Sequence, residues 1–211
     1  SVDLVKVTGH SMFIPILISI INTSGYLVSI NIILPVLLFL LYDLNALQVG
    51  LLLLLPNLCI VIGSQFSRLK PDFEPKRINL IGATIGLLSS LFFMLVSLFY
   101  QPTFFVIMLT FCSFGFCRGL SKPSSLSLAL RFIHPNADIL LPLIMGYSAV
   151  PTAIIIQIMS IIPEQSITTV SCLLIAITAL HFWCARRICN YHESNNLDKT
   201  SSGQPVTIKY G

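Results

Sequence analysis

The chain has 211 residues, of which 9% are charged and 55% are hydrophobic, and its mean hydropathy is +0.89. A water-soluble domain carries about 25% charged residues, so this composition excludes a soluble fold and indicates a membrane protein. The net charge of +4 is too small to indicate a nucleic-acid partner, and we expect the chain to lie in a lipid bilayer. At about 20 residues per span, its length allows six or seven helices across the bilayer.

Six apolar runs predict an all-α membrane protein with six transmembrane helices. In chain order the runs are residues 12–42, 46–64, 79–100, a run from residue 103, 139–162 and 166–185. The fourth run resumes after Pro123 and fits one long helix to about Phe132. We therefore expect a cytoplasmic N-terminus over residues 1–11, a membrane domain over 12–188, and a polar, disordered cytoplasmic tail over 189–211.

The basic residues predict the orientation of these helices. All twelve Lys and Arg residues fall before the first run, between the second and third, from the middle of the fourth to the fifth, or after the sixth. The short loops at residues 43–45, 101–102 and 163–165 contain none. By the positive-inside rule these loops are extracytoplasmic and both termini are cytoplasmic, although the sequence does not say in which membrane.

The first run carries polar residues where lipid-facing residues are expected. Asn22, Tyr26 and Ser29 are spaced so that all three share one face of a helix. Two interpretations remain open for this face. It forms hydrogen bonds to other helices of the bundle, or it lines a solvated path for a substrate.

The fourth helix carries two cations inside the predicted span. Arg118 and Lys122 are four residues apart and share one helix face, whereas no acidic residue lies inside any of the six runs. Either the two side chains extend to the cytoplasmic headgroups, or they face a cavity that receives an anion. The counter-charge would then come from a small anionic solute, a lipid headgroup or another chain.

The remaining polar residues favour binding over catalysis. Gln157 is the main polar residue of the fifth run, and we expect His181 to lie at the cytoplasmic boundary of the sixth rather than in a proton relay. No catalytic sequence motif, metal-ligand spacing or cofactor motif is present, so we expect no enzyme activity, no metal and no cofactor.

Several short patterns resemble the major facilitator superfamily, in particular one six-helix half of such a transporter. Residues 35–69 are similar to the passage between its first two helices, and the loop that follows keeps part of a glycine and basic-residue motif. The fourth helix has its spaced glycines and a proline, and the fifth keeps one glycine and one proline of the antiporter pattern. The matching residues are Gly63, Arg68, Lys76, Arg77, Gly115, Gly119, Pro123, Gly146 and Pro151.

The resemblance implies gating or structural roles for those matching residues. It also implies a three-plus-three inverted repeat, with helices 1, 2, 4 and 5 around a central cavity and helices 3 and 6 outside. Two departures stand out. Ser67 occupies the position of an acidic motif residue, with about seven residues inserted after it, and Phe111 occupies the position of a membrane-embedded arginine.

Two functions follow from these observations. The first is a half-size secondary transporter that moves a small polar or anionic solute together with a second six-helix unit, either a second copy or a partner chain. Its solute would be bound by residues from four helices: Arg118, Lys122, Asn22, Tyr26, Asn57 and Gln157. The alternative is a membrane scaffold or accessory subunit of a larger complex that transports nothing.

Overall fold

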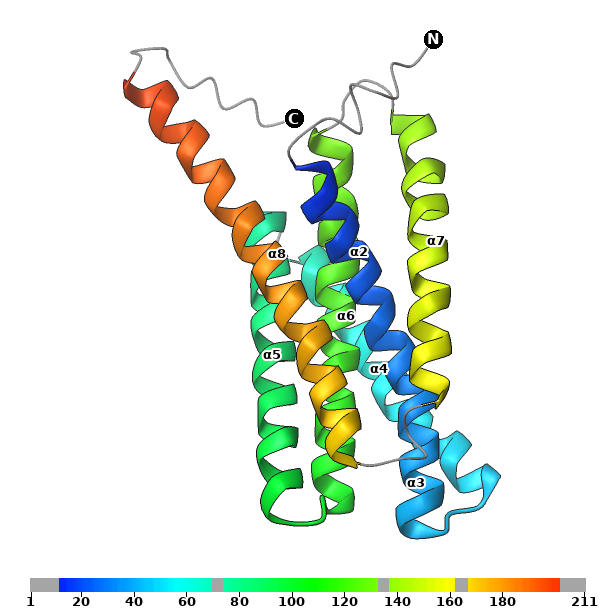
Figure 1. The fold of residues 1–211 in the computed structure, drawn as a ribbon. Helices are drawn as coiled ribbons and strands as arrows, with labels where there is room; N and C mark the ends of the chain where they lie inside the picture. Colours follow the sequence, from blue (N-terminus) through cyan, green and yellow to red (C-terminus); the bar gives the residue numbers. More distant parts are fainter. Residues whose placement is uncertain (1–11, 70–73, 133–136, 162–166, 202–211) are drawn as a thin grey trace.

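The computed structural model describes residues 12–69, 74–132, 137–161 and 167–201, which form long helices joined by short loops (Figure 1). The elements are α2 (Phe13–Val28), η1 (Ser29–Ile33), α3 (Leu34–Tyr42), α4 (Ala46–Leu69), α5 (Pro75–Phe99), α6 (Phe104–Phe132), α7 (Ala137–Ile161) and α8 (Ile167–Ser201). Because α2, η1 and α3 follow one another without a break, we call them span one. In Figure 1, span one begins at the upper end of the bundle and ends at the lower end.

Among the described residues, five helices are long and apolar enough to cross a membrane. They cover residues Phe13–Tyr42, Ala46–Arg68, Pro75–Phe99, Phe104–Leu130 and Ile167–Tyr191. The described part of α7 adds a shorter apolar stretch, Ile144–Ile158. The prediction of an all-α protein with membrane-spanning helices is therefore confirmed, and so is a fourth helix that continues through Pro123 to Phe132.

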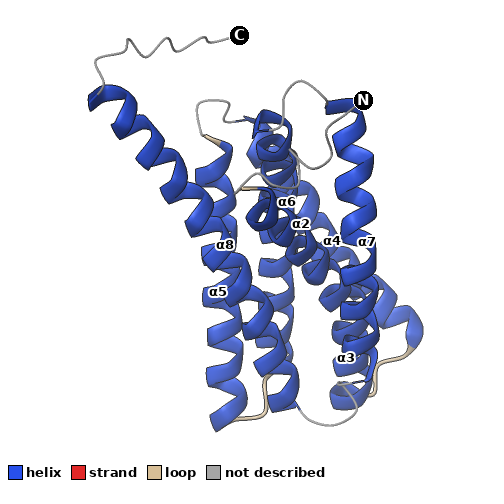
Figure 2. Ribbon diagram, turned by 45° about the horizontal axis from the view of Figure 1, so that its top comes forward, coloured by secondary structure: helices blue, strands red, loops and turns tan. Residues whose placement is uncertain are grey.

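The C-terminal tail differs from the prediction. Helix α8 continues to Ser201, so the expectation of a disordered segment from residue 189 is wrong for residues 189–201. The physical reason is that the sequence contains neither glycine nor proline between Ile167 and Gly203, so nothing in it interrupts a helix. The upper part of α8 leans away from the other helices in both ribbon views (Figures 1 and 2). The predicted N-terminal segment 1–11 and residues 202–211 lie outside the described residues.

Helix α6 packs against span one, α4 and α5, and glycine allows its close approach to α4. A Cβ atom added at Gly63 would lie 2.5 Å from the carbonyl oxygen of Phe116, and one added at Gly119 would lie 2.9 Å from the Cα of Gly63. At Gly115 it would collide with the carbonyl oxygen of Pro56. Small residues at such a crossing increase van der Waals contact, which drives helix association in a membrane. Gly63, Gly115 and Gly119 thus lie where α4 and α6 approach most closely, and the gating or structural roles that the resemblance implies for them stay a prediction.

Helices α5 and α8 meet along a seam of small residues. The hydroxyls of Ser97 and Ser171 lie 3.0 Å apart, and those of Ser90 and Thr178 lie 2.7 Å apart. Ser90 lies seven residues before Ser97 on α5, and Thr178 lies seven residues after Ser171 on α8. A seven-residue repeat is the spacing at which two helices stay in contact over several turns.

Helix α7 has a much smaller buried face. It packs on α2, with Ile144 and Ser148 buried, while most of its described side chains are exposed. In both ribbon views it stands on one side of the bundle, opposite α5 and α8 (Figures 1 and 2). Gly146 is exposed, with no atom within 4 Å of an added Cβ, and Pro151 is half-buried inside the helix.

Gly119→Ala should lower the stability of the protein by about 1–3 kcal/mol, because its methyl group must push α4 away from α6. Gly146→Ala is the matched control, since it has open space around it and alanine favours the helix. The measurement is the thermal unfolding midpoint of each purified variant in detergent. A Gly119→Ala midpoint equal to that of Gly146→Ala would contradict the close α4–α6 contact.

Candidate functional site

Five buried polar residues from four helices form a connected hydrogen-bond network, which we call the polar core. Its members are Ser19 and Tyr26 on α2, Asn79 on α5, Ser125 on α6 and His181 on α8. Each is at most 1% exposed. Because lipid offers no hydrogen bonds, side chains of this kind must find their partners inside the protein.

His181 joins two of these helices to its own. Its Nδ1 lies 2.9 Å from the hydroxyl of Tyr26, and its Nε2 lies 3.3 Å from Oδ1 of Asn79. A carboxamide oxygen only accepts hydrogen bonds, so Nε2 carries a proton and, in the neutral imidazole, Nδ1 accepts from the Tyr26 hydroxyl. Both ring nitrogens thus have a partner.

The carboxamide of Asn79 closes a ring with two serines. Its Nδ2 donates to Oγ of Ser19 at 3.2 Å, Ser19 and Ser125 lie 2.9 Å apart, and Ser125 donates back to Oδ1 at 3.2 Å. One consistent direction of donation runs around this ring, from Asn79 to Ser19 to Ser125 and back. Such a satisfied network rigidifies the helices that contribute to it.

The polar core decides between the two interpretations of the polar face of span one. Tyr26 bonds to another helix of the bundle, so the hydrogen-bonding interpretation holds for it, and His181, which we expected at the cytoplasmic boundary, is fully buried among the helices. Sequence reasoning missed Asn79, Ser19 and Ser125. One signal was present, because Ser19 lies seven residues before Tyr26 and so shares its helix face.

Asn22 lies on the same face of α2, one turn from Ser19 and from Tyr26. It is 2% exposed, and its Nδ2 has no hydrogen-bond partner among the described residues. Leaving a buried donor unpaired costs about 1–3 kcal/mol. Asn22 is thus the least satisfied side chain on the face that joins α2 to the polar core.

Arg118 lies at the middle of α6. It is fourteen residues from Phe104, about 21 Å along the helix from the lower end, and its side chain is half-buried. Its Nη1 donates to the backbone carbonyl of Thr23 on α2 at 3.3 Å. That carbonyl lies inside α2, where it already accepts the hydrogen bond of a backbone N–H. The guanidinium keeps four further N–H groups that this bond does not use.

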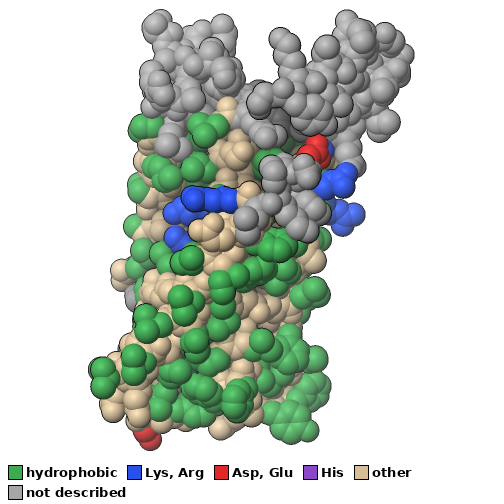
Figure 3. All heavy atoms as spheres, turned by 180° about the vertical axis from the view of Figure 1, so that it is seen from behind, with side chains coloured by type: hydrophobic (Ala, Val, Ile, Leu, Met, Phe, Trp, Pro, Cys, Tyr) green, Lys and Arg blue, Asp and Glu red, His purple; other side chains and the backbone are tan. Residues whose placement is uncertain are grey.

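Lys122 follows one turn above Arg118 and is also half-buried. Among the described residues both ion pairs involve Glu74, and neither includes Arg118 or Lys122. On the face drawn in Figure 3, Lys and Arg side chains lie in the upper half, while apolar side chains cover the lower half. The described structure therefore leaves two cations of α6 without a carboxylate.

The other predicted binding residues are not joined to Arg118 by any described contact. Asn57 is half-buried on α4, and its Nδ2 donates to the carbonyl of Leu53 in its own helix at 2.8 Å. Gln157 is exposed on α7. The described residues include no group of three or more His, Cys, Asp or Glu side chains that could hold a metal ion.

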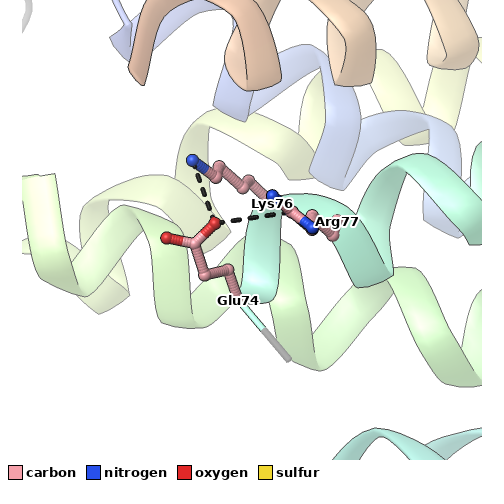
Figure 4. Close-up of polar contacts among 3 residues, drawn as sticks. All are labelled: Glu74, Lys76 and Arg77. Atoms are coloured by element: carbon pink, nitrogen blue, oxygen red, sulfur yellow. Dashed lines mark ion pairs between the residues drawn. The ribbon is translucent and has the colours of Figure 1, made fainter. Parts of the chain in front are cut away.

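The predicted basic motif lies at the upper ends of α4 and α5. Lys76 is 4% exposed, with its Nζ 3.0 Å from Oε2 of Glu74, and Nε of Arg77 lies 3.7 Å from the same oxygen. Figure 4 shows both cations beside this one carboxylate. Arg68 is exposed at the end of α4. Glu74 thus supplies an acidic partner in the loop where Ser67 replaces the expected one.

Tyr26→Phe should destabilise the protein by about 1 kcal/mol, or a few degrees in Tm, because Nδ1 of His181 loses its only described donor. Tyr147→Phe is the control, since Tyr147 is 55% exposed on α7. Thermal unfolding of both purified variants in the same detergent measures the effect. Equal Tm values for the two variants would show that the Tyr26–His181 bond contributes nothing.

Comparisons with known proteins do not extend the resemblance to the major facilitator superfamily. No family model matches the chain, and no curated protein and no solved structure matches it. The family assignment therefore remains an expectation from short sequence patterns. What the chain does has to follow from its own helix contacts, charges and hydrogen bonds.

Proposed function

We propose that this chain is one six-helix unit of a secondary transporter, embedded in a membrane with both termini in the cytoplasm. It moves a small polar or anionic solute by alternating access together with a second six-helix unit. The observation that carries this proposal is Arg118, a half-buried guanidinium in the middle of a long apolar helix that forms no ion pair with any described carboxylate. A charge at such a depth is costly, and it usually marks a substrate or ion path.

The pattern of helix contacts supports the architecture of this unit. If span one is exchanged with α6, α4 with α7, and α5 with α8, the set of contacts remains the same. The α4–α6 contact becomes α7–span one, α5–α6 becomes α8–span one, and span one–α4 becomes α6–α7. The contacts α5–α8 and span one–α6 map onto themselves.

This symmetry is the one expected of a three-plus-three inverted repeat. Each repeat has an odd number of spans, so the second repeat crosses the membrane in the direction opposite to the first. Figure 1 agrees with this, because span one descends from the upper end while α6 rises from the lower end. In such repeats the substrate lies where the two repeats meet, and Arg118 on α6 reaches span one at that place.

The second unit follows from the mechanism. Alternating access requires two bodies that rock around a shared site, and one three-plus-three unit supplies only one of them. Helices α4 and α7 carry exposed apolar side chains, among them Leu51, Leu58, Val150 and Ile154, which lipid or a second unit would cover.

Arg118→Ala should reduce transport by about tenfold or more, because hydrogen bonds to a charged group contribute about 1.5–3 kcal/mol. The measurement is uptake of labelled phosphate, succinate and gluconate into proteoliposomes that contain the full chain. Arg118→Lys should retain part of the activity, since it keeps the charge but loses the planar fork. Arg186→Ala is the control, because Arg186 is exposed on α8.

Unchanged uptake in Arg118→Ala would contradict the role of Arg118. The oligomeric state of the chain in mild detergent tests the proposal of a two-unit transporter. Native mass spectrometry measures it. Two copies, or one copy with another six-helix chain, support a two-unit transporter. A single copy bound among unrelated subunits, without uptake of any probe, would instead support the scaffold.

The orientation makes a separate prediction. An epitope tag inserted at residues 43–45 should be accessible on the extracytoplasmic face of sealed vesicles of known sidedness, whereas tags at either terminus should not be. Both ends of the described bundle fit this arrangement, because α2 begins and α8 ends at the upper end (Figure 1). Permeabilised vesicles, in which every tag is accessible, are the control. If the terminal tags are accessible in sealed vesicles, the predicted orientation is wrong and the termini are extracytoplasmic.

A further inference from the structure

Asn31 is a polar side chain that is exposed in the middle of span one. It lies eleven residues before Tyr42, about 16 Å along the helix from the lower end. This is close to half of a hydrocarbon layer of about 30 Å. An exposed carboxamide at that depth would be costly against lipid, so it requires a polar partner.

Asn31 also occupies η1, the one π-helical turn among the described residues. The N–H of Leu34 donates to the carbonyl of Ser29, five residues back instead of four. Pro35 explains this widening, because it has no N–H to donate to the carbonyl of Asn31 in an ordinary α-helical turn. Turns of this type occur frequently at functional sites.

The helices around η1 bring other polar residues to a similar depth. η1 contacts α4, α6 and α7. Asn57 on α4 is eleven residues from Ala46, also about 16 Å from the lower end, and Arg118 on α6 is about 21 Å from it. The Nδ2 of Asn57 donates to the carbonyl of Leu53. The Oδ1 of Asn57 is left to accept a hydrogen bond from a ligand.

The charges in this region define what could bind there. Arg118 and Lys122 provide two positive charges one turn apart, and no acidic residue lies inside span one, α4 or α6. The two asparagines lie about 5 Å further from the upper end than Arg118 and offer only neutral donors and acceptors. A complementary ligand has an anionic group at one end and hydroxyl groups at the other.

We propose that η1, α4 and α6 together bind a hydroxylated organic anion, with its acid group at Arg118 and Lys122 and its hydroxyls at Asn31 and Asn57. This inference rests on the proposed transport function and specifies its substrate class. It adds Asn31 as a specificity-determining residue. The same chemistry occurs in soluble sugar acids and in the headgroup of phosphatidylglycerol, and we assign the site to the soluble anion.

Three probes of similar size separate the two ends of the site. Gluconate has a carboxylate and hydroxyls, hexanoate has the carboxylate alone, and sorbitol has the hydroxyls alone. Binding of each probe is measured by isothermal titration calorimetry on the full chain in phosphatidylcholine nanodiscs. We expect gluconate to bind about tenfold or more tightly than either of the other two, and equal affinities for gluconate and hexanoate would overturn the proposal.

Variants then assign each end to its residues. Asn31→Leu should remove the preference for gluconate over hexanoate, whereas Arg118→Ala should abolish the binding of both acids. Asn190→Leu is the matched control, because Asn190 is exposed on α8, and its gluconate affinity should stay within about twofold of the wild type. If Arg118→Ala abolishes binding but Asn31→Leu retains the preference, this inference fails while the transport proposal stands.

Two further measurements test the alternatives that Asn31 joins two copies of the chain or binds a lipid headgroup. Native mass spectrometry of Asn31→Leu tests whether the residue joins two copies of the chain, and a lost dimer with unchanged gluconate preference would overturn the proposal. Nanodiscs that contain phosphatidylglycerol test the lipid source. Loss of gluconate binding in those nanodiscs would assign the site to the lipid headgroup and overturn the assignment to a soluble anion.

Discussion

The carboxamide of Asn79 is the contact on which the bundle depends most. It bonds to Ser19 on α2, to Ser125 on α6 and to His181 on α8, so one side chain of α5 connects four helices. In lipid no water can replace a lost partner, so these four helices can separate only by leaving polar groups unpaired. The hydroxyl pairs along the α5–α8 seam add to this constraint and fix how those two helices align.

The two helices outside this network are attached in other ways. Helix α4 is held by close packing at Gly63, Gly115 and Gly119 and by a thiol hydrogen bond between Cys59 on α4 and Cys112 on α6. Helix α7 rests on α2 by a narrow buried face. The contact symmetry relates α4 to α7, so the bundle consists of four spans joined through the polar core and two flanking helices that lie outside this network.

The sequence predicted the features that depend on composition over many residues. The spans, their order and the long α6 follow from apolar runs of sufficient length. Features set by a partner far along the chain were missed. Asn79 and His181 are 102 residues apart, so nothing local shows that they bond. The π turn at η1 was also missed, because it follows from the N–H that Pro35 lacks rather than from any pattern of apolar residues.

The contrast between Asn79 and Arg118 is the strongest argument that this protein binds a ligand. Both the nitrogen and the oxygen of the Asn79 carboxamide, and both nitrogens of the His181 ring beside it, have hydrogen-bond partners on other helices. Yet α6 also keeps a guanidinium in the middle of its length, with one described bond to a helical carbonyl, although a charge there costs about 2.5–3.5 kcal/mol on insertion. If only the stability of the helix in the membrane mattered, we would expect an apolar residue such as leucine at this position. Arg118 therefore remains unexplained by packing, and the anion that we propose to bind at span one, α4 and α6 would supply the missing partner.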